Sequence, residues 1–132
     1  MMLRPFTLSG MLLIAIPLAV GCGSGNNGGR QMLSLALHPA VATPAPGANS
    51  QFTAIGTFNK LPSPDKVNPM MWVETALDGL HGGTGIAAVD QSGLAQCNRS
   101  GTTWITATAL TGALNTFGDP ALVRGTAQLN CP

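Results

Sequence analysis

His81 has the side chain best suited to act as a general base or metal ligand, and it lies in a glycine-rich stretch with Asp78 and Thr84. A hydrolase would also need a paired nucleophile and an oxyanion hole, and neither has a signature in this sequence. No phosphate loop is indicated, because no Gly-Lys-Ser/Thr follows the glycines. We therefore predict a surface loop with no catalytic, metal-binding or cofactor-binding residue, in which Asp78 and His81 are candidates for a binding surface.

Acidic side chains could also bind calcium where loops of the fold meet. They are scattered along the chain and have no EF-hand spacing, so whether loops gather them is left open. The residues concerned are Asp65, Glu74, Asp78, Asp90 and Asp119.

The cysteines suggest a different chemistry, beginning with Cys22 at the end of an apolar run. Arg4 precedes this run of residues 8–20, as in a secretory signal peptide, and the run is too short to span a bilayer. The segment Ala19-Val20-Gly21-Cys22 resembles the lipobox of bacterial lipoproteins, which implies that Cys22 is acylated, with palmitate, and becomes the first residue of the mature chain. The same residues also suit an ordinary signal peptidase, which would leave Cys22 as a thiol.

This reading predicts three segments. Residues 1–21 form the signal peptide, residues 22–30 a lipidated cysteine and flexible Gly/Asn tether, and residues 31–132 a folded domain. Gly23 is not the Asp-type signal for retention in the inner membrane, so we expect an exported, lipid-anchored protein, in the outer membrane where the cell has one. Cys97 and Cys131 are then left as one pair, either a disulfide permitted by export or two buried thiols.

Composition favours strands and excludes a nucleic-acid partner. Charged residues make up 8% of the chain, whereas 17 Gly and 10 Pro supply turns. Loss of Arg4 with the leader would equalise basic and acidic residues, so nothing would steer the protein to nucleic acid or to an anionic surface.

Beyond Arg30, apolar residues recur at every second position, which is the period of a strand with one buried face. We predict about seven short strands in a two-sheet all-β sandwich, with Trp72 at the centre of the core and Cys97 and Cys131 facing inward. Leu33, Leu35 and Leu37 share one face of the first strand, and Met70 faces the same way as Trp72. Pro62, Pro64 and Pro69 give a loop, and residues 90–93 form a hairpin turn. The expected strands are residues 33–38, 51–58, 70–75, 86–89, 94–97, 102–109 and 122–131.

The order of these segments resembles a bacterial immunoglobulin-like domain of group 2. The resemblance is carried by residues 51–58, by Trp72, and by residues 86–94, 101–108 and 125–129. It implies an immunoglobulin-like β-sandwich, and members of this family usually serve as spacers or adhesive modules in surface proteins. Here a single copy stands alone, and the stretches 73–85 and 110–120 are longer than usual for the family.

Trp104 is the unusual residue of this pattern, because the alternation turns it outward beside Thr106 and Thr108. It is either a binding surface for a sugar or a protein, or it is covered by the predicted loop 110–120. We expect a non-enzymatic envelope lipoprotein that binds a protein or polysaccharide at the cell surface through loops 74–85 and 110–120 at one end of the sandwich. The alternatives are a passive spacer or accessory subunit of an envelope complex and, from another class, a small enzyme or enzyme inhibitor.

Overall fold

Residues 28–76 and 82–132 are described by the structure, a computed structural model, and this part of the chain contains ten β-strands and no helix. The leader, Cys22, Asp78 and His81 lie outside the described residues. The strands are β1 (Met32–His38), β2 (Val41–Ala42), β3 (Asn49–Gln51), β4 (Thr53–Phe58), β5 (Asp65–Val67), β6 (Met71–Thr75), β7 (Ala87–Val89), β8 (Leu94–Cys97), β9 (Gly101–Leu114) and β10 (Pro120–Cys131).

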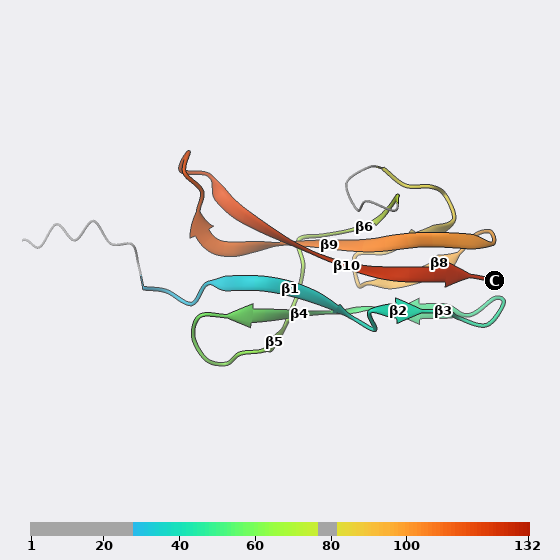
Figure 1. The fold of residues 1–132 in the computed structure, drawn as a ribbon, viewed down its shortest axis with the longest axis horizontal. Coiled ribbons are helices and arrows are strands. Elements are labelled where there is room, and N and C mark those ends of the chain that lie inside the picture. The colour runs from blue at the N-terminus through green and yellow to red at the C-terminus, as the bar shows by residue number, and fades with distance from the viewer. Residues whose placement is uncertain (1–27, 77–81) are drawn as a thin grey trace, which may run out of the picture.

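The strands form three sheets in the orders β1-β4-β5, β2-β10-β9-β6 and β3-β8-β7. All pairings are antiparallel except that of β2 with β10. Strands β1 and β4 lie in a layer beneath the long β9–β10 pair (Figure 1). The described part of the chain is therefore all-β and layered, as predicted, but it has ten strands in three sheets instead of about seven strands in two.

The core lies where β1 and β4 approach the β9–β10 pair. Phe52, Ile105 and Leu129 are fully buried, and Trp72 is 4% exposed, as predicted for the central core residue. At Gly125 the layers come so close that a Cβ would lie 2.7 Å from the carbonyl oxygen of Leu35. Glycine permits this approach because it has no side chain.

The predicted disulfide joins Cys97 and Cys131, with a Cα–Cα distance of 5.6 Å. Cys97 ends β8 and Cys131 ends β10, so the bond links two different sheets. The reading of these residues as two buried thiols is wrong for this structure.

Three predictions about the strands need correction. Leu33 is 63% exposed and Met32 is buried in its place, because a register shift between Met32 and Ser34 moves the start of β1 out of the period-two phase. The proline-rich stretch contains a short strand, β5, paired with β4. Met70 is exposed, because it precedes β6 and does not share the buried face of Trp72.

The outward face predicted for β9 is also wrong. Thr106 and Thr108 are buried, as are Ile105 and Ala107 on the opposite face. The middle of β9 is thus buried on both faces, and it is also an interior strand of its sheet, paired with β6 on one edge and with β10 on the other. A period-two pattern cannot reveal this, because threonine is compatible with both an exposed and a buried strand face.

Candidate functional site

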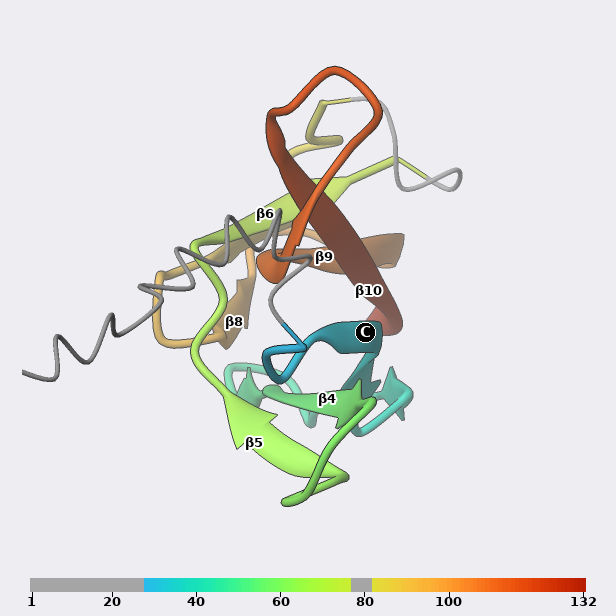
Figure 2. The same ribbon diagram turned by 90° about the vertical axis from the view of Figure 1, so that its left-hand side faces the viewer.

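The most distinctive feature of the molecule is the distal half of the β9–β10 hairpin, residues 110–122, called the arm below. Its strands remain paired as far as Leu114 and Pro120. The arm rises away from the layered body (Figure 1), and Figure 2 shows it standing above the other strands. The predicted loop 110–120 is thus a strand-turn-strand projection.

The tip of the arm is ordered by its own hydrogen bonds. The Asn115 side-chain oxygen accepts from the backbone N–H groups of Phe117 (2.9 Å) and Asp119 (3.0 Å), and the backbone N–H of Asn115 donates to the Asp119 carbonyl (2.8 Å). Lower on the arm, the Thr111 hydroxyl donates to the Ala121 carbonyl at 3.1 Å. A turn braced in this way holds its side chains in fixed directions.

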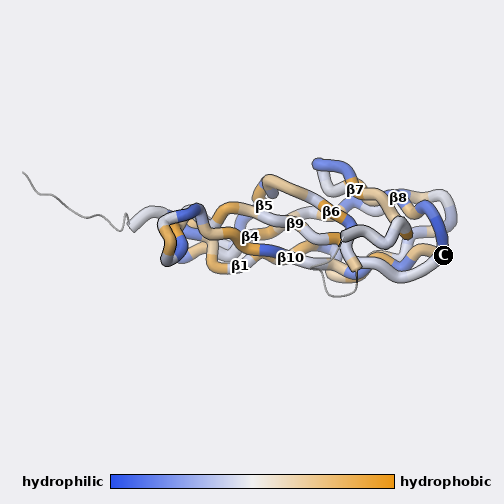
Figure 3. The backbone as a smooth tube through the Cα atoms, turned by 90° about the horizontal axis from the view of Figure 1, so that it is seen from above, coloured by the Kyte–Doolittle hydropathy of each residue, from blue (hydrophilic) through white to orange (hydrophobic). Residues whose placement is uncertain are grey.

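The arm presents several large apolar side chains to solvent, beside the polar residues of its tip, and Figure 3 shows hydrophobic (orange) and hydrophilic (blue) segments together at this end of the molecule. Phe117 is 89% exposed and Leu114 69%, while Leu110 and Leu122, which face each other across the two strands, are about half exposed. Four of the nine exposed large apolar side chains among the described residues therefore belong to this one hairpin. Single exposed leucines are common, but a projection that gathers several marks a contact surface.

The described chain begins beside the base of the arm. A Cβ on Gly112 would lie 3.3 Å from the Arg30 carbonyl oxygen. Arg30 in turn pairs with Asp65 at 2.9 Å and lies over the ring of Phe58, 3.5 Å from its centroid. These contacts place the N-terminal entry, the arm and the β4–β5 turn at one end of the molecule (Figure 1).

A second polar cluster surrounds Glu74 on β6. Its carboxylate accepts hydrogen bonds from the hydroxyls of Thr84 and Thr103 and from the backbone N–H of Gly85. Partial burial raises the pKa of Glu74, but these hydrogen bonds outweigh it and hold the pKa below its ordinary value. All the donors satisfy the ionised carboxylate, so the cluster ties the 84–85 segment to β6 and β9.

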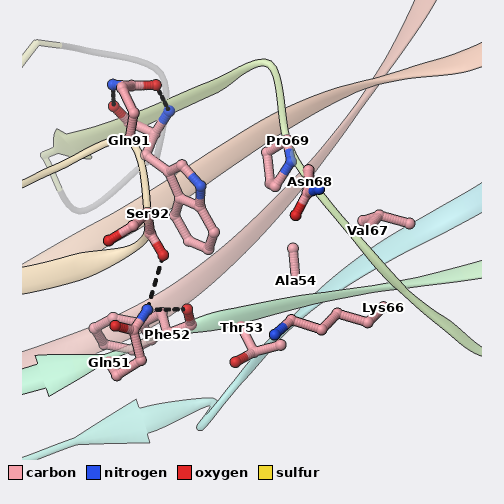
Figure 4. Close-up of a pocket in the computed structure, with 11 residues that line it drawn as sticks. Gln51, Phe52, Thr53, Ala54, Lys66, Val67, Asn68, Pro69, Gln91 and Ser92 are labelled. Carbon is pink, nitrogen blue, oxygen red and sulfur yellow. Dashed lines mark hydrogen bonds between the residues drawn. The ribbon is translucent and has the colours of Figure 1, made fainter.

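A shallow crease of about 250 Å³ lies between the β4–β5 pair and the 91–92 turn. Figure 4 shows that the Gln51 side chain bonds to the carbonyls of Phe52 and Ser92, while Gln91 bonds to the backbone of Trp72. The amides at this crease are thus engaged in holding segments of the fold together. The Lys66, Asn68 and Thr53 side chains complete its polar lining.

The two loops expected at one end of the sandwich lie far apart. Thr75, where the first loop begins, pairs with Trp104, whereas the arm starts six residues further along β9, about 20 Å away. The arm therefore does not cover Trp104. This excludes the alternative in which the segment 110–120 covers the ring. The Trp104 side chain is half-buried, and its indole Nε1 is buried with no hydrogen-bond partner among the described residues.

The other predicted site residues are dispersed. Thr84 belongs to the Glu74 cluster, and Asp90 caps its own turn by accepting from the backbone N–H groups of Ser92 and Leu94. These hydrogen bonds hold the pKa of Asp90 below its ordinary value.

Within residues 28–76 and 82–132, no three His, Cys, Asp or Glu side chains gather to hold a metal ion. This same part of the chain has no helix long and apolar enough to cross a membrane.

Comparison with models of known protein families finds no match, and comparison with curated protein sequences finds no similar chain. The resemblance to bacterial immunoglobulin-like domains and the lipobox reading of Cys22 therefore stay predictions.

The sequence predicted a binding role for the segment 110–120 but did not single out Leu114 and Phe117 within it. A signal was present, because Asn115-Thr-Phe-Gly-Asp119 combines turn-forming Asn and Gly, and the alternation of β9 continues through Leu110 to Leu114. A long strand joined by such a turn to the last strand predicts a protruding hairpin. Reading the whole stretch 110–120 as a loop hid the paired strands within it.

Proposed function

We propose that this chain is a non-enzymatic lipoprotein of the bacterial cell envelope, in which an immunoglobulin-like β-sandwich carries the arm as its binding element. The arrangement of β1 and β4 beneath β9 and β10, with Trp72 buried between them and a disulfide joining β8 to β10, supports the sandwich. The apolar run that ends at Cys22 supports export and lipid attachment.

The observation that carries the binding role is the exposure of Phe117 and Leu114 on an ordered hairpin. Burying a phenylalanine or leucine side chain is favourable by about 1.5–3 kcal/mol relative to leaving it in water. The arm could have folded without these residues, because its hydrogen bonds come from Asn115, Thr111 and the backbone. A surface of this kind suits an apolar partner better than a polysaccharide, which needs convergent hydrogen-bonding groups.

A photoreactive amino acid placed at position 117 in the living cell tests this role. Val41 provides the matched control, because it is also apolar and exposed (54%) but lies on β2, away from the arm. We expect adducts with envelope components at position 117 and none at position 41. The absence of adducts at both positions would favour the alternative, a passive spacer or accessory subunit whose specific property is its attachment.

A further inference from the structure

The tip of the arm, the loop that carries Leu61 and the N-terminal entry at Gly28 all lie at the same end of the molecule. In Figure 1 the three reach similar levels along the long axis, and Figure 2, seen from that end, shows the arm above and the β4–β5 turn below. Leu61 is 84% exposed and Phe117 is 89% exposed. The opposite end carries the C-terminus and the 43–48 loop.

The first described residues, which form the N-terminal entry, are held to the body of the domain by hydrogen bonds and an ion pair. Gln31 and Asn59 exchange hydrogen bonds, with the backbone N–H of Gln31 donating to the Asn59 side chain at 2.7 Å and the backbone N–H of Asn59 donating to the Gln31 carbonyl at 3.0 Å. Arg30 adds its ion pair with Asp65. Whatever holds the chain upstream of Gly28 therefore holds this end of the domain.

Gly28 lies six positions after Cys22, so the chain between them spans at most about 20 Å. A lipid on Cys22 would keep the N-terminal end of the domain within that distance of the bilayer surface. The tip of the arm lies five residues beyond Gly112, which itself adjoins Arg30. Five extended residues span at most about 17 Å, so a tether of this length allows Phe117 and Leu114 to reach the lipid headgroups.

We propose that the arm docks on the bilayer that holds the acylated Cys22, with Phe117, Leu114 and Leu61 entering the interface between headgroups and acyl chains. This inference rests on the lipid anchor of the proposed function. Phenylalanine and leucine are typical of segments that lie in this interface. Lys60 and Asp119 nearly balance each other in charge at this end, so the contact is chiefly apolar and should depend little on salt.

The contact would fix how the domain stands on the membrane. One attachment at Cys22 leaves the domain to rotate about its tether, whereas a second contact through the arm sets its long axis away from the surface. The 43–48 loop and the C-terminal end would then point into the surrounding space.

A fluorophore on an introduced cysteine tests this docking in the full mature lipoprotein, reconstituted into phosphatidylethanolamine–phosphatidylglycerol vesicles that contain lipid-borne quencher. Asp119→Cys places the probe at the arm tip and Ala45→Cys places it at the opposite end, while Cys97 and Cys131 are held in their disulfide. We expect quenching several-fold stronger at position 119 than at position 45, and little change at high salt. Equal quenching at the two positions would overturn the docking and leave the anchor intact.

Adding Leu114→Ser and Phe117→Ser to the Asp119→Cys protein provides the matched variant, because both side chains are exposed and their loss leaves the core untouched. Quenching at position 119 should fall to the level at position 45. Unchanged quenching, or protection of the probe only after an envelope protein extract is added, would refute the bilayer as the occupant. Should mass spectrometry find Cys22 unmodified, the anchor fails by itself, and failure of the unanchored protein to float with vesicles then refutes the docking as well.

Discussion

At Gly93 the backbone has a φ of 82°, which side chains rarely allow, and a Cβ there would lie 2.6 Å from the Phe52 carbonyl oxygen. We expect Gly93→Ala to lower the free energy of unfolding by at least about 2 kcal/mol, since both backbone strain and overpacking against Trp72 contribute. Chemical denaturation measures the change. Gly82→Ala is the control, because no atom of the described residues lies within 4 Å of a Cβ built there, and equal effects of the two substitutions would contradict the packing at Gly93.

Ionised Glu74 should stabilise the folded protein, and this contribution should be lost at acidic pH. The pKa of Glu74 in the folded protein lies below its ordinary value of 4.5, so its contribution is fully present above pH 4.5 and is lost as the pH falls through the folded pKa. We expect Glu74→Gln to cost about 1–2 kcal/mol at pH 7, because the amide has one acceptor oxygen where the carboxylate has two, so it cannot serve both the Thr84 and Thr103 hydroxyls on Oε1 and the Gly85 N–H on Oε2.

Thermal unfolding of both proteins between pH 7 and pH 3 measures this dependence. The difference in Tm between the natural protein and Glu74→Gln should shrink as the pH falls below 4.5. A difference that stays constant over the whole range would mean that the charge of Glu74 does not contribute.

Single residues were predictable where a side chain has one favourable environment. The strand pattern predicts Trp72 in the core and Cys97 and Cys131 on inward faces, and these two cysteines remain as one pair if Cys22 carries lipid. Leu33 was misplaced, because the register shift beside it depends on the partner strand β4 and leaves no local signal. Trp104 was placed on an exposed face for a similar reason, since the burial of β9 on both sides depends on its neighbours.

At the scale of elements, the disulfide is the link whose removal is easiest to measure. Cys97 and Cys131 are 34 residues apart in sequence, so the double variant Cys97→Ser, Cys131→Ser should lose about 3–4 kcal/mol of stability in the chain-entropy model. Chemical denaturation with and without reductant checks this. The natural protein in reductant should match the variant, and a reductant effect on the variant would show that the loss has another cause.

The arm is the element that sequence reasoning described least well. Two glycines and Pro120 within residues 110–120 indicate a loop, but the paired backbone of β9 and β10 extends to Leu114 and Pro120. Hairpin extension depends on hydrogen bonds between two distant segments, which a local pattern does not contain. The turn 90–93 was predictable because its capping side chain, Asp90, belongs to the turn itself.

Substitution of the exposed apolar side chains of the arm should leave the stability of the body nearly unchanged. Leu114→Ser together with Phe117→Ser removes two side chains that are 69% and 89% exposed, so the Tm should stay within about 1–2 °C of the natural value, as for surface substitutions that change stability by less than 0.5 kcal/mol. Calorimetry measures this. A large fall in Tm would show that the arm is packed against the body and is not a contact surface.

For the whole molecule, composition and period were enough to predict an all-β, layered fold with one disulfide. The organisation into three sheets with ten strands in the described residues was not predictable, because β2, β3 and β5 are only two or three residues long. Such strands form when a neighbouring edge is within reach, and that depends on the complete fold. The placement of the arm beside the N-terminal entry is likewise a property of the assembled molecule.

The proposed role of the molecule depends on attachment at Cys22. With a lipid there, the exposed arm and the N-terminal entry share the end of the domain closest to the membrane; without it, their proximity has no such consequence. Intact-mass and tandem mass spectrometry of the mature protein from the envelope is therefore the most direct test. We predict a chain that begins at Cys22 with a glyceride and acyl chains on that residue, and a chain with an unmodified Cys22 thiol would contradict the lipoprotein.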